Sequence, residues 1–191
     1  MMENKQNHYG TAAMAAGETY EAKVGMEMLE RCGNNPNGKG VVHELLYRDA
    51  YNANPLNIAS GRNAQLARSA TAVRDDIVIR QGGKIVRRAQ LKDTANSVGK
   101  TVQQAAGHKY AGTALMGTEE TTAAYTAKTA KVGSDLQKMQ STGISSGTTS
   151  RIANKALGKA LPLDSVLSAA GTAAGFGGAI GDAISELFSW F

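Results

Sequence analysis

The stretch RDDIVIRQGGKIVRRAQLKDT, residues 74–94, constrains the fold of this chain more than any other part of it. Its two apolar runs, DIVIRQ and KIVRRAQLK, are rich in β-branched residues and are separated by Gly82-Gly83. A glycine pair accepts the positive φ angles of a tight turn, and β-branched residues favour strands. The stretch therefore predicts a β-hairpin, and with it a small sheet in the middle of the chain.

Alternation along the two predicted strands sorts their side chains onto opposite faces. Ile77 and Ile79 fall on one face of the first strand, and Asp76 falls on the other. On the second strand Gln90 and Lys92 share a face. A carboxylate at the start of one strand and a Gln-x-Lys sequence on the next can therefore occupy neighbouring positions.

Helical periodicity dominates on both sides of the hairpin. Residues 11–32 indicate an amphipathic helix that ends at the turn CGNNPNG, and a second helix starts near Lys39. We expect a loop over residues 54–63, a short helix or irregular connection over 64–72, and mainly helix from 94 to 139. The predicted fold is α+β: a small central sheet whose β-hairpin carries the D…QxK motif, flanking helices, and a helical Gly/Ala-rich C-terminal tail.

Composition divides the chain into four segments. We expect an N-terminal helical region at 1–37, an α+β domain at 38–140, a polar linker at 141–152 and the tail at 153–191. The tail contains an uncharged run, residues 165–181, that is short for a membrane span and consists largely of alanine and glycine. We expect it to pack or to support a homo-oligomer, with membrane contact as the lesser alternative.

Two further features of the sequence favour a cytoplasmic protein. The start MMENKQNHYG is polar and lacks the apolar run of a secretory signal. The single cysteine, Cys32, excludes an internal disulfide framework.

Positive charge is concentrated around the hairpin. Residues 60–92 hold eight Lys and Arg against two Asp, whereas the rest of the chain is nearly balanced. Such a region favours phosphate-bearing partners, because its cations displace counterions from nucleic acid. A solvated basic face is the alternative interpretation. The candidate nucleic-acid-binding residues are Arg62, Arg68, Arg74, Arg80, Lys84 and Arg88.

The residues near the start of the hairpin suit phosphodiester hydrolysis. That reaction uses a divalent metal held by oxygen ligands, which neutralises developing charge and activates a water molecule. Asp76 and Gln90 offer such oxygens, and Glu44, on the preceding helix, offers another. A lysine such as Lys92 can position the water and stabilise the charged transition state.

This order of residues resembles the PD-(D/E)XK nuclease superfamily over about residues 38–105: a helix with Glu44, Asp76 on a strand, QLK on the next strand, and then a helix. It also resembles uncharacterised phage, prophage or mobile-element proteins, to about residue 155. Two positions depart from the nuclease pattern. Asp75 stands where proline is expected, and Gln90 stands where glutamate is expected. The amide carries no charge, so metal affinity should be lower.

The resemblance implies a metal-dependent nuclease or nucleic-acid-processing protein of phage or mobile-element type. In this interpretation Asp76 and Gln90 hold Mg²⁺ or Mn²⁺, Glu44 adds a ligand or orients water, and Lys92 assists the nucleophile. We expect DNA rather than RNA as the partner. The alternatives are an inactive nucleic-acid-binding relative, a purely structural hairpin, and a non-enzymatic mobile-element protein that acts through its tail. A protein of the last kind would be a defence effector, a toxin, or a virion or scaffold component.

Overall fold

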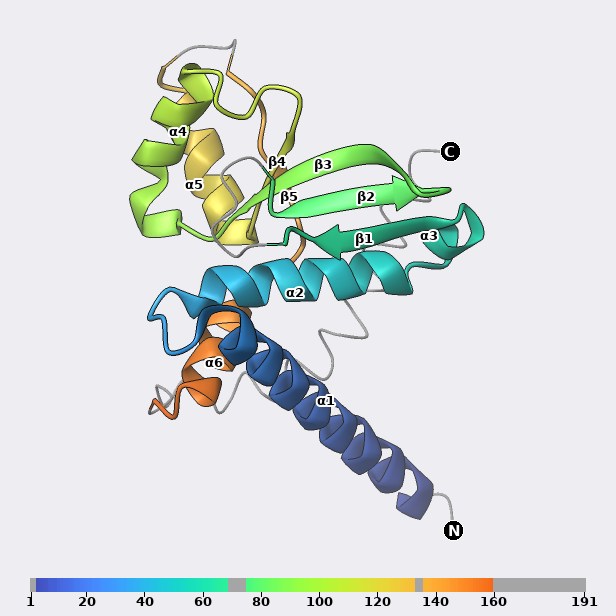
Figure 1. Ribbon diagram of the computed structural model, residues 1–191. Helices are drawn as coiled ribbons and strands as arrows, with labels where there is room; N and C mark the ends of the chain where they lie inside the picture. Colours follow the sequence, from blue (N-terminus) through green and yellow to red (C-terminus); the bar gives the residue numbers. More distant parts are fainter. Residues whose placement is uncertain (1–2, 69–74, 133–135, 160–191) are drawn as a thin grey trace.

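The computed structural model describes residues 3–68, 75–132 and 136–159, which form an α+β fold with six α-helices and a five-stranded mixed sheet (Figure 1). The helices are α1 (Glu3–Cys32), α2 (Gly38–Ala53), α3 (Pro55–Ala59), α4 (Val98–Ala106), α5 (Glu119–Thr129) and α6 (Ser146–Ala156). The strands are β1 (Arg62–Leu66), β2 (Ile77–Gln81), β3 (Lys84–Lys92), β4 (Ala114–Gly117) and β5 (Gln140–Ser141). A 3₁₀ turn, η1 (Ala95–Ser97), precedes α4.

The sheet has the strand order β1-β2-β3-β4-β5. Strands β1, β2 and β3 form an antiparallel meander, and β4 lies parallel to β3 and to β5. The predicted β2–β3 hairpin is confirmed, and its turn residues Gly82 and Gly83 have φ angles of 55° and 78°. An irregularity in the ladder between Ile79 and Arg80 offsets the two strands near the turn. The chain crosses from β3 through α4 to reach β4.

The alternation predicted for the hairpin is also found. Ile77 pairs with Ala89 across the two strands, and both side chains are fully buried. They belong to an apolar layer that contacts two tyrosines of α2, so α2 covers this face of the sheet. The members of the layer are Ala64, Ile77, Ile79, Ala89, Leu91 and Met116, with Tyr47 and Tyr51 packed against them.

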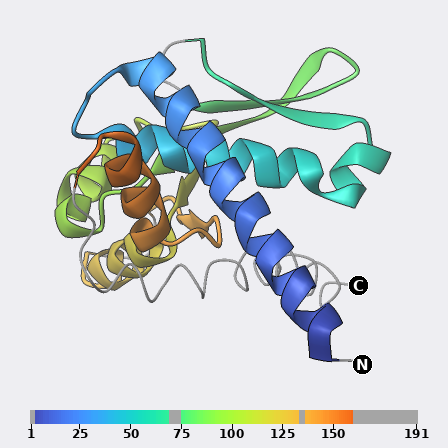
Figure 2. The same ribbon diagram turned by 90° about the horizontal axis from the view of Figure 1, so that it is seen from below.

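Helix α2 lies between the sheet and a second layer of helices. Residues 41–46 are all buried, because α1 and α6 pack against the side of α2 that faces away from the sheet (Figures 1 and 2). The core of this layer consists of Val24, Met28, Val41, Val42, Leu45, Leu46, Ile152 and Ala153. Helices α4 and α5 pack together beside β4 and form a third apolar cluster around Leu115, Tyr110 and Tyr125.

A buried ion pair joins α1 to α6. Arg151 donates two hydrogen bonds of 2.6 Å to the two carboxylate oxygens of Glu21, and only 8% of the surface of Arg151 is exposed. Parallel two-bond pairs of this kind are among the stronger polar contacts in proteins. Residues 130 positions apart are thereby held together.

Four segments differ from their sequence-based predictions. Residues 55–59 form helix α3 rather than a loop, residues 62–66 form strand β1 rather than a loop or irregular connection, and residues 114–117 form strand β4 rather than helix. Strand β4 is short and buried on both faces, so it has no polar alternation to reveal it. Of the segment predicted as a linker, residues 146–152 lie in α6.

The C-terminal tail is described only to residue 159, and the remainder, residues 160–191, lies outside the described residues. Its predicted packing, self-association and membrane contact therefore stay predictions. Among the helices that the structure describes, none has the length and apolar character needed to cross a membrane.

Candidate active site

Asp76 lies just before β2 and continues the hydrogen bonding between β2 and β3 at the end away from the turn. The backbone N–H of Asp76 donates to Ala89 O over 2.9 Å, and its side-chain Oδ2 accepts from Leu91 N over 2.7 Å and from Gln90 Nε2 over 2.6 Å. Asp76 and Gln90 are only 8% and 5% exposed. The structure thus brings together the two residues that alternation predicted to be neighbours.

The oxygen of the Gln90 amide has no hydrogen-bond partner among the residues that the structure describes. This oxygen, Oε1, is buried. A buried amide oxygen without a donor or a cation is energetically unfavourable, so most such groups are satisfied. Gln90 Oε1 is therefore an oxygen ligand available beside the Asp76 carboxylate.

Glu44 reaches the same region from α2 and is 8% exposed. Burial, and secondly the negative charge of Asp76, raise the pKa of its carboxyl from 4.5 to about 8. The cations of Arg31 and Lys92 oppose this shift. Burial disfavours the charged carboxylate and the nearby negative charge of Asp76 adds to this effect, so Glu44 stays protonated over much of the neutral range.

Lys92 supplies a cation to the pair of carboxylates. Burial lowers the pKa of its ammonium group and nearby Lys109 lowers it too, whereas Asp76 and Glu44 act in the opposite direction. Its Nζ lies 5.8 Å from the centroid of the Tyr110 ring, within range of a cation–π contact. Lys92 therefore lies over an aromatic ring, and the charges of Asp76 and Glu44 act on its pKa without a direct ion pair among the described residues. We call Glu44, Asp76, Gln90 and Lys92 the candidate site.

Arg31, at the end of α1, also reaches this site and was not predicted from the sequence. Its Nη2 donates to Ala67 O over 2.8 Å and lies 3.9 Å from Glu44 Oε2. Ala67 N in turn donates to Asp76 O over 2.7 Å. The Nε of Arg31 is buried with no hydrogen-bond partner among the described residues. No local motif marks Arg31, because only the packing of α1 against α2 brings it here.

A third buried carboxylate, Asp93, follows Lys92 but has a structural role. It accepts hydrogen bonds from Ser146 Oγ over 2.7 Å and Thr149 Oγ1 over 2.5 Å, and Lys39 Nζ lies 3.3 Å away. These contacts fix the first turn of α6 and the start of α2 against the end of β3. Asp93 was not predicted as a buried residue, since its partners lie far away along the sequence.

His43, beside Glu44, is also buried and does not join the candidate site. Its Nε2 is 2.8 Å from Thr142 Oγ1, and its Nδ1 has no hydrogen-bond partner in the described part of the chain. Burial lowers its pKa to about 4, so the imidazole is neutral at ordinary pH. It therefore acts as a packing residue of α2.

The donor atoms of the candidate site are of the type that hard divalent cations bind. Glu44 and Asp76 offer carboxylate oxygens and Gln90 offers an amide oxygen, and Mg²⁺ and Mn²⁺ bind to oxygen ligands. Within the described residues there is no cluster of three or more His, Cys, Asp or Glu that could hold a metal. The set therefore depends on Gln90, and it carries at most two negative charges.

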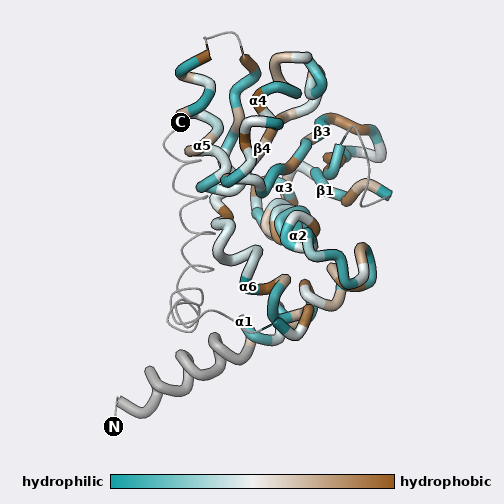
Figure 3. Tube along the Cα trace, turned by 90° about the vertical axis from the view of Figure 1, so that its left-hand side faces the viewer, coloured by the Kyte–Doolittle hydropathy of each residue, from teal (hydrophilic) through white to brown (hydrophobic). Residues whose placement is uncertain are grey.

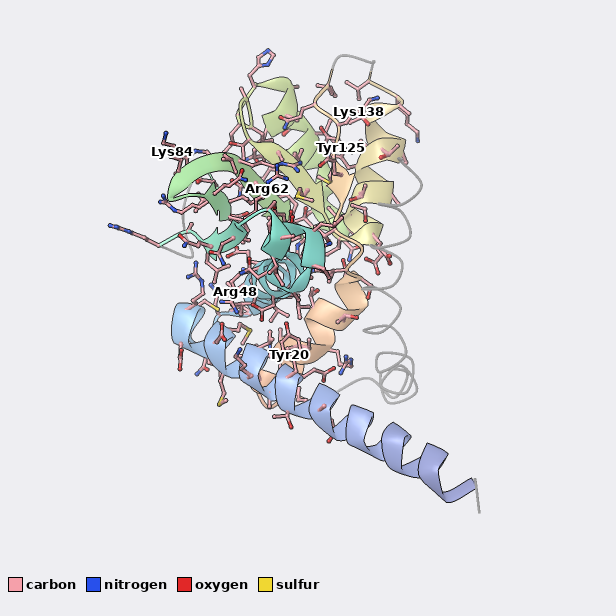
Figure 4. All side chains as sticks on the ribbon, turned by 90° about the vertical axis from the view of Figure 1, so that its right-hand side faces the viewer. Tyr20, Arg48, Arg62, Lys84, Tyr125 and Lys138 are labelled. Atoms are coloured by element: carbon pink, nitrogen blue, oxygen red, sulfur yellow. The ribbon has the colours of Figure 1, made fainter. Side chains whose placement is uncertain are left out.

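The six basic residues proposed to contact nucleic acid differ in their surroundings. Arg62, Arg68 and Lys84 are exposed. Arg88 is half-buried and donates to Asp75 over 2.5 Å, and Arg80 donates to Gln65 Oε1 over 3.1 Å. Arg74 lies outside the described residues. Exposed and partly engaged cations thus line β1 and the hairpin (Figure 4).

Comparison with known proteins finds no protein-family model that matches the chain, and no curated protein or solved structure that matches it either. The chemistry assigned to the candidate site therefore rests on its own residues.

Proposed function

We propose that this protein is a metal-dependent nuclease whose active site is formed by Glu44, Asp76, Gln90 and Lys92. One observation carries the proposal: the buried carboxylate of Asp76, whose charge raises the pKa of the buried carboxyl of Glu44, adjoins an amide oxygen that has no hydrogen-bond partner among the described residues. Like charges and an unsatisfied oxygen in one buried place are costly, and a bound divalent cation relieves both. The adjacent basic surface supplies the contacts that a polyanionic substrate requires.

In this proposal Asp76, Gln90 and Glu44 would hold Mg²⁺ or Mn²⁺. The ion, when bound, would neutralise phosphate charge and lower the pKa of a coordinated water molecule. Glu44 must release its proton before it can act as a ligand, so binding is coupled to pH. The hydrogen bond from Gln90 Nε2 to Asp76 keeps both side chains oriented before any ion arrives.

Lys92 acts on the substrate rather than on the metal. Its ammonium group lies over the Tyr110 ring and makes no ion pair with a described carboxylate, so it can donate hydrogen bonds to a phosphate oxygen as negative charge develops there. The lowered pKa, caused first by burial, also makes Lys92 a better proton donor than a solvated lysine. Arg31, next to Glu44, adds a second cation at the edge of the site.

The test is a cleavage assay of the full chain on circular DNA, linear DNA and RNA, with Mg²⁺ or Mn²⁺ and with a chelator. Asp76→Asn and Lys92→Ala should each abolish cleavage, because one removes a charged ligand and the other removes the phosphate contact. Glu119→Gln and Lys100→Ala are matched controls, since both residues are exposed on helices α5 and α4. Circular dichroism and thermal melting would show that each variant is folded.

Metal-dependent cleavage that is lost in both site variants and kept in both controls would support the proposal. If the folded wild-type protein cleaves none of the substrates with either metal, the nuclease proposal is wrong. Retained binding of nucleic acid in that case would indicate an inactive relative, in which Gln90 has replaced the glutamate expected from the nuclease pattern.

A further inference from the structure

Along β1, β2 and β3, one face of the sheet packs against α2, and the opposite face is accessible in the part of the chain that the structure describes. Helix α2 lies between these strands and helices α1 and α6 (Figure 3). The side chains that point away from α2 are all exposed or half-buried. They form what we call the open face: Asn63 and Gln65 of β1, Val78 and Arg80 of β2, and Ile85 and Arg88 of β3.

The open face leads to the candidate site. Alternation along β3 places Arg88, Gln90 and Lys92 on one face of that strand. Asp76, just before β2, is bonded to Gln90. At about 3.3 Å per residue, Arg88 lies roughly 7 Å from Gln90 along the strand. A polymer on the open face therefore meets the candidate site at one end of that face.

The charge of the open face is positive. No Asp or Glu occurs between residues 77 and 92, whereas Arg80 and Arg88 both belong to this face. Arg80 donates to Gln65 Oε1 over 3.1 Å and to Gly83 O over 2.8 Å, so its guanidinium has a fixed orientation. The amides of Asn63 and Gln65 add hydrogen-bond donors. Cations and amide donors on one accessible face suit the phosphates of a nucleic acid.

One carboxylate outside the candidate site adjoins this face. Asp75 Oδ2 accepts a hydrogen bond of 2.5 Å from Arg88 Nη1, and the two side chains are 13% and 30% exposed. The bond engages one of the five N–H donors of the guanidinium, and no other described residue accepts from it. A partly exposed ion pair of this kind contributes little to stability, so an incoming anion can replace the carboxylate at low cost.

We propose that the open face binds the phosphate backbone of DNA, and that Arg88 exchanges its partner Asp75 for a DNA phosphate when the polymer binds. The inference rests on the proposed function, since it assigns a positioning residue to the substrate of the candidate site. A guanidinium binds phosphate through two parallel hydrogen bonds, whereas its contact with Asp75 is a single bond. At about 3.4 Å of rise per nucleotide, the phosphate held by Arg88 should lie within about two nucleotides of the cleaved bond.

An anionic membrane is a poorer partner for the open face. Proteins bind membrane surfaces when apolar side chains enter the acyl boundary beside the cations. On the open face the aliphatic side chains are those of Val78 and Ile85, and Val78 is half-buried. The amides of Asn63 and Gln65 match the hydrogen-bonding groups of a nucleic acid better than they match lipid chains.

The experiment is a double-mutant cycle on DNA binding by the full chain, in a chelator so that no metal-dependent cleavage occurs. Affinity for a labelled DNA duplex of mixed sequence is measured for the wild type, Asp75→Asn, Arg88→Ala and the double variant. Arg87→Ala is the matched charge control, since Arg87 is the preceding residue of β3 and is exposed on the opposite face. A control cycle uses Arg48→Ala and Asp49→Asn, whose ion pair on α2 measures 2.6 Å. Thermal melting shows that each variant is folded.

Arg88→Ala should weaken DNA binding by about tenfold, because a phosphate contact is lost. Asp75→Asn should tighten binding by about fivefold when Arg88 is present, because no carboxylate competes with the phosphate, and by about twofold or less in Arg88→Ala. Arg87→Ala should change affinity by about twofold or less, and the control cycle should show no coupling. Wild-type affinity of Arg88→Ala, an equal effect of Asp75→Asn in both backgrounds, or weaker binding by Asp75→Asn would each overturn the inference. Binding of phosphatidylserine vesicles without binding of the DNA duplex would overturn it too.

Failure of this inference can be told apart from failure of the nuclease proposal. Coupling between Asp75 and Arg88 in DNA binding, without metal-dependent cleavage, would contradict only the nuclease activity. Cleavage that needs Asp76 and Lys92, by a protein whose DNA binding shows no such coupling, would contradict only the exchange at Arg88.

Discussion

Gln90 and Asp76 are joined by a 2.6 Å hydrogen bond in which the amide Nε2 donates and the carboxylate Oδ2 accepts. The amide is uncharged, so it does not neutralise the Asp76 carboxylate. A glutamate at position 90 would instead repel that carboxylate. Without a metal, the buried site is therefore stabilised by this hydrogen bond. With a metal, the site offers one negative charge fewer than it would with glutamate at position 90.

Gln90→Glu should tighten the binding of Mg²⁺ or Mn²⁺ and weaken the protein that has no metal. An added ligand charge should lower the Kd by about tenfold or more, because charge count tunes the affinity of oxygen sites. Without metal, the lost donor and the new like charge should reduce the free energy of unfolding by about 1–3 kcal/mol. Thermal melting with and without metal measures both effects.

The exposed substitution Gln103→Glu, on α4, is the control for a general effect of added charge. If Gln90→Glu raises neither metal affinity nor the metal-induced shift in Tm, Gln90 is not a ligand.

Glu44 should make the metal-free protein less stable as the pH rises from 6.5 to 8. Its pKa is raised from 4.5 to about 8 by burial, so its stabilising effect is complete below pH 4.5 and is lost as the pH passes 8. His43 has the opposite sign, because its pKa is lowered from 6.5 to about 4, but its contribution is complete above pH 6.5. Between pH 6.5 and 8 the loss due to Glu44 is about 1.5 kcal/mol.

Glu44→Gln resembles the protonated side chain and should remove this pH dependence. Denaturant unfolding at several pH values checks the difference between wild type and variant. Saturating Mg²⁺ should reverse the slope in the wild type, since binding requires the deprotonated carboxylate, and should leave Glu44→Gln unchanged. Parallel curves for the two proteins would contradict the assigned pKa.

Arg31 should set the pH at which the site accepts a metal. Its guanidinium lies 3.9 Å from Glu44 and opposes the upward shift of that pKa. Arg31→Met should raise the pKa of Glu44 and move the pH midpoint of metal binding upward by about one unit. Titration of Mn²⁺ affinity against pH measures this shift, and Lys23→Met on the same helix is the control.

If Arg31 served only to stabilise the fold through its hydrogen bond to Ala67 O, its replacement would have a different effect. Its replacement would lower Tm without moving the midpoint of metal binding. Arg31→Lys keeps the charge and should restore most of the wild-type midpoint, even if the hydrogen bond to Ala67 is weakened.

Local pattern explains why the hairpin was predictable and the rest of the site was not. The alternation of β2 and β3 predicted that Asp76 and Gln90 could be neighbours, because the strands and their turn are encoded within twenty residues. Strand β4 was missed because a short parallel strand buried on both faces has no alternation. Arg31 and Asp93 were missed because their partners come from other helices, which only tertiary packing brings close.

The ion pair between Glu21 and Arg151 should hold α1, and with it Arg31, against the rest of the protein. Glu21→Ala leaves a buried guanidinium without its two-bond partner and should lower the free energy of unfolding by about 2–4 kcal/mol. Glu18→Ala, an exposed position on the same helix, should change it by less than about 0.5 kcal/mol. Chemical denaturation measures both values. Hydrogen exchange should also increase first in α1 and α6 of Glu21→Ala, and an unchanged exchange pattern there would show that apolar packing alone joins the two helices.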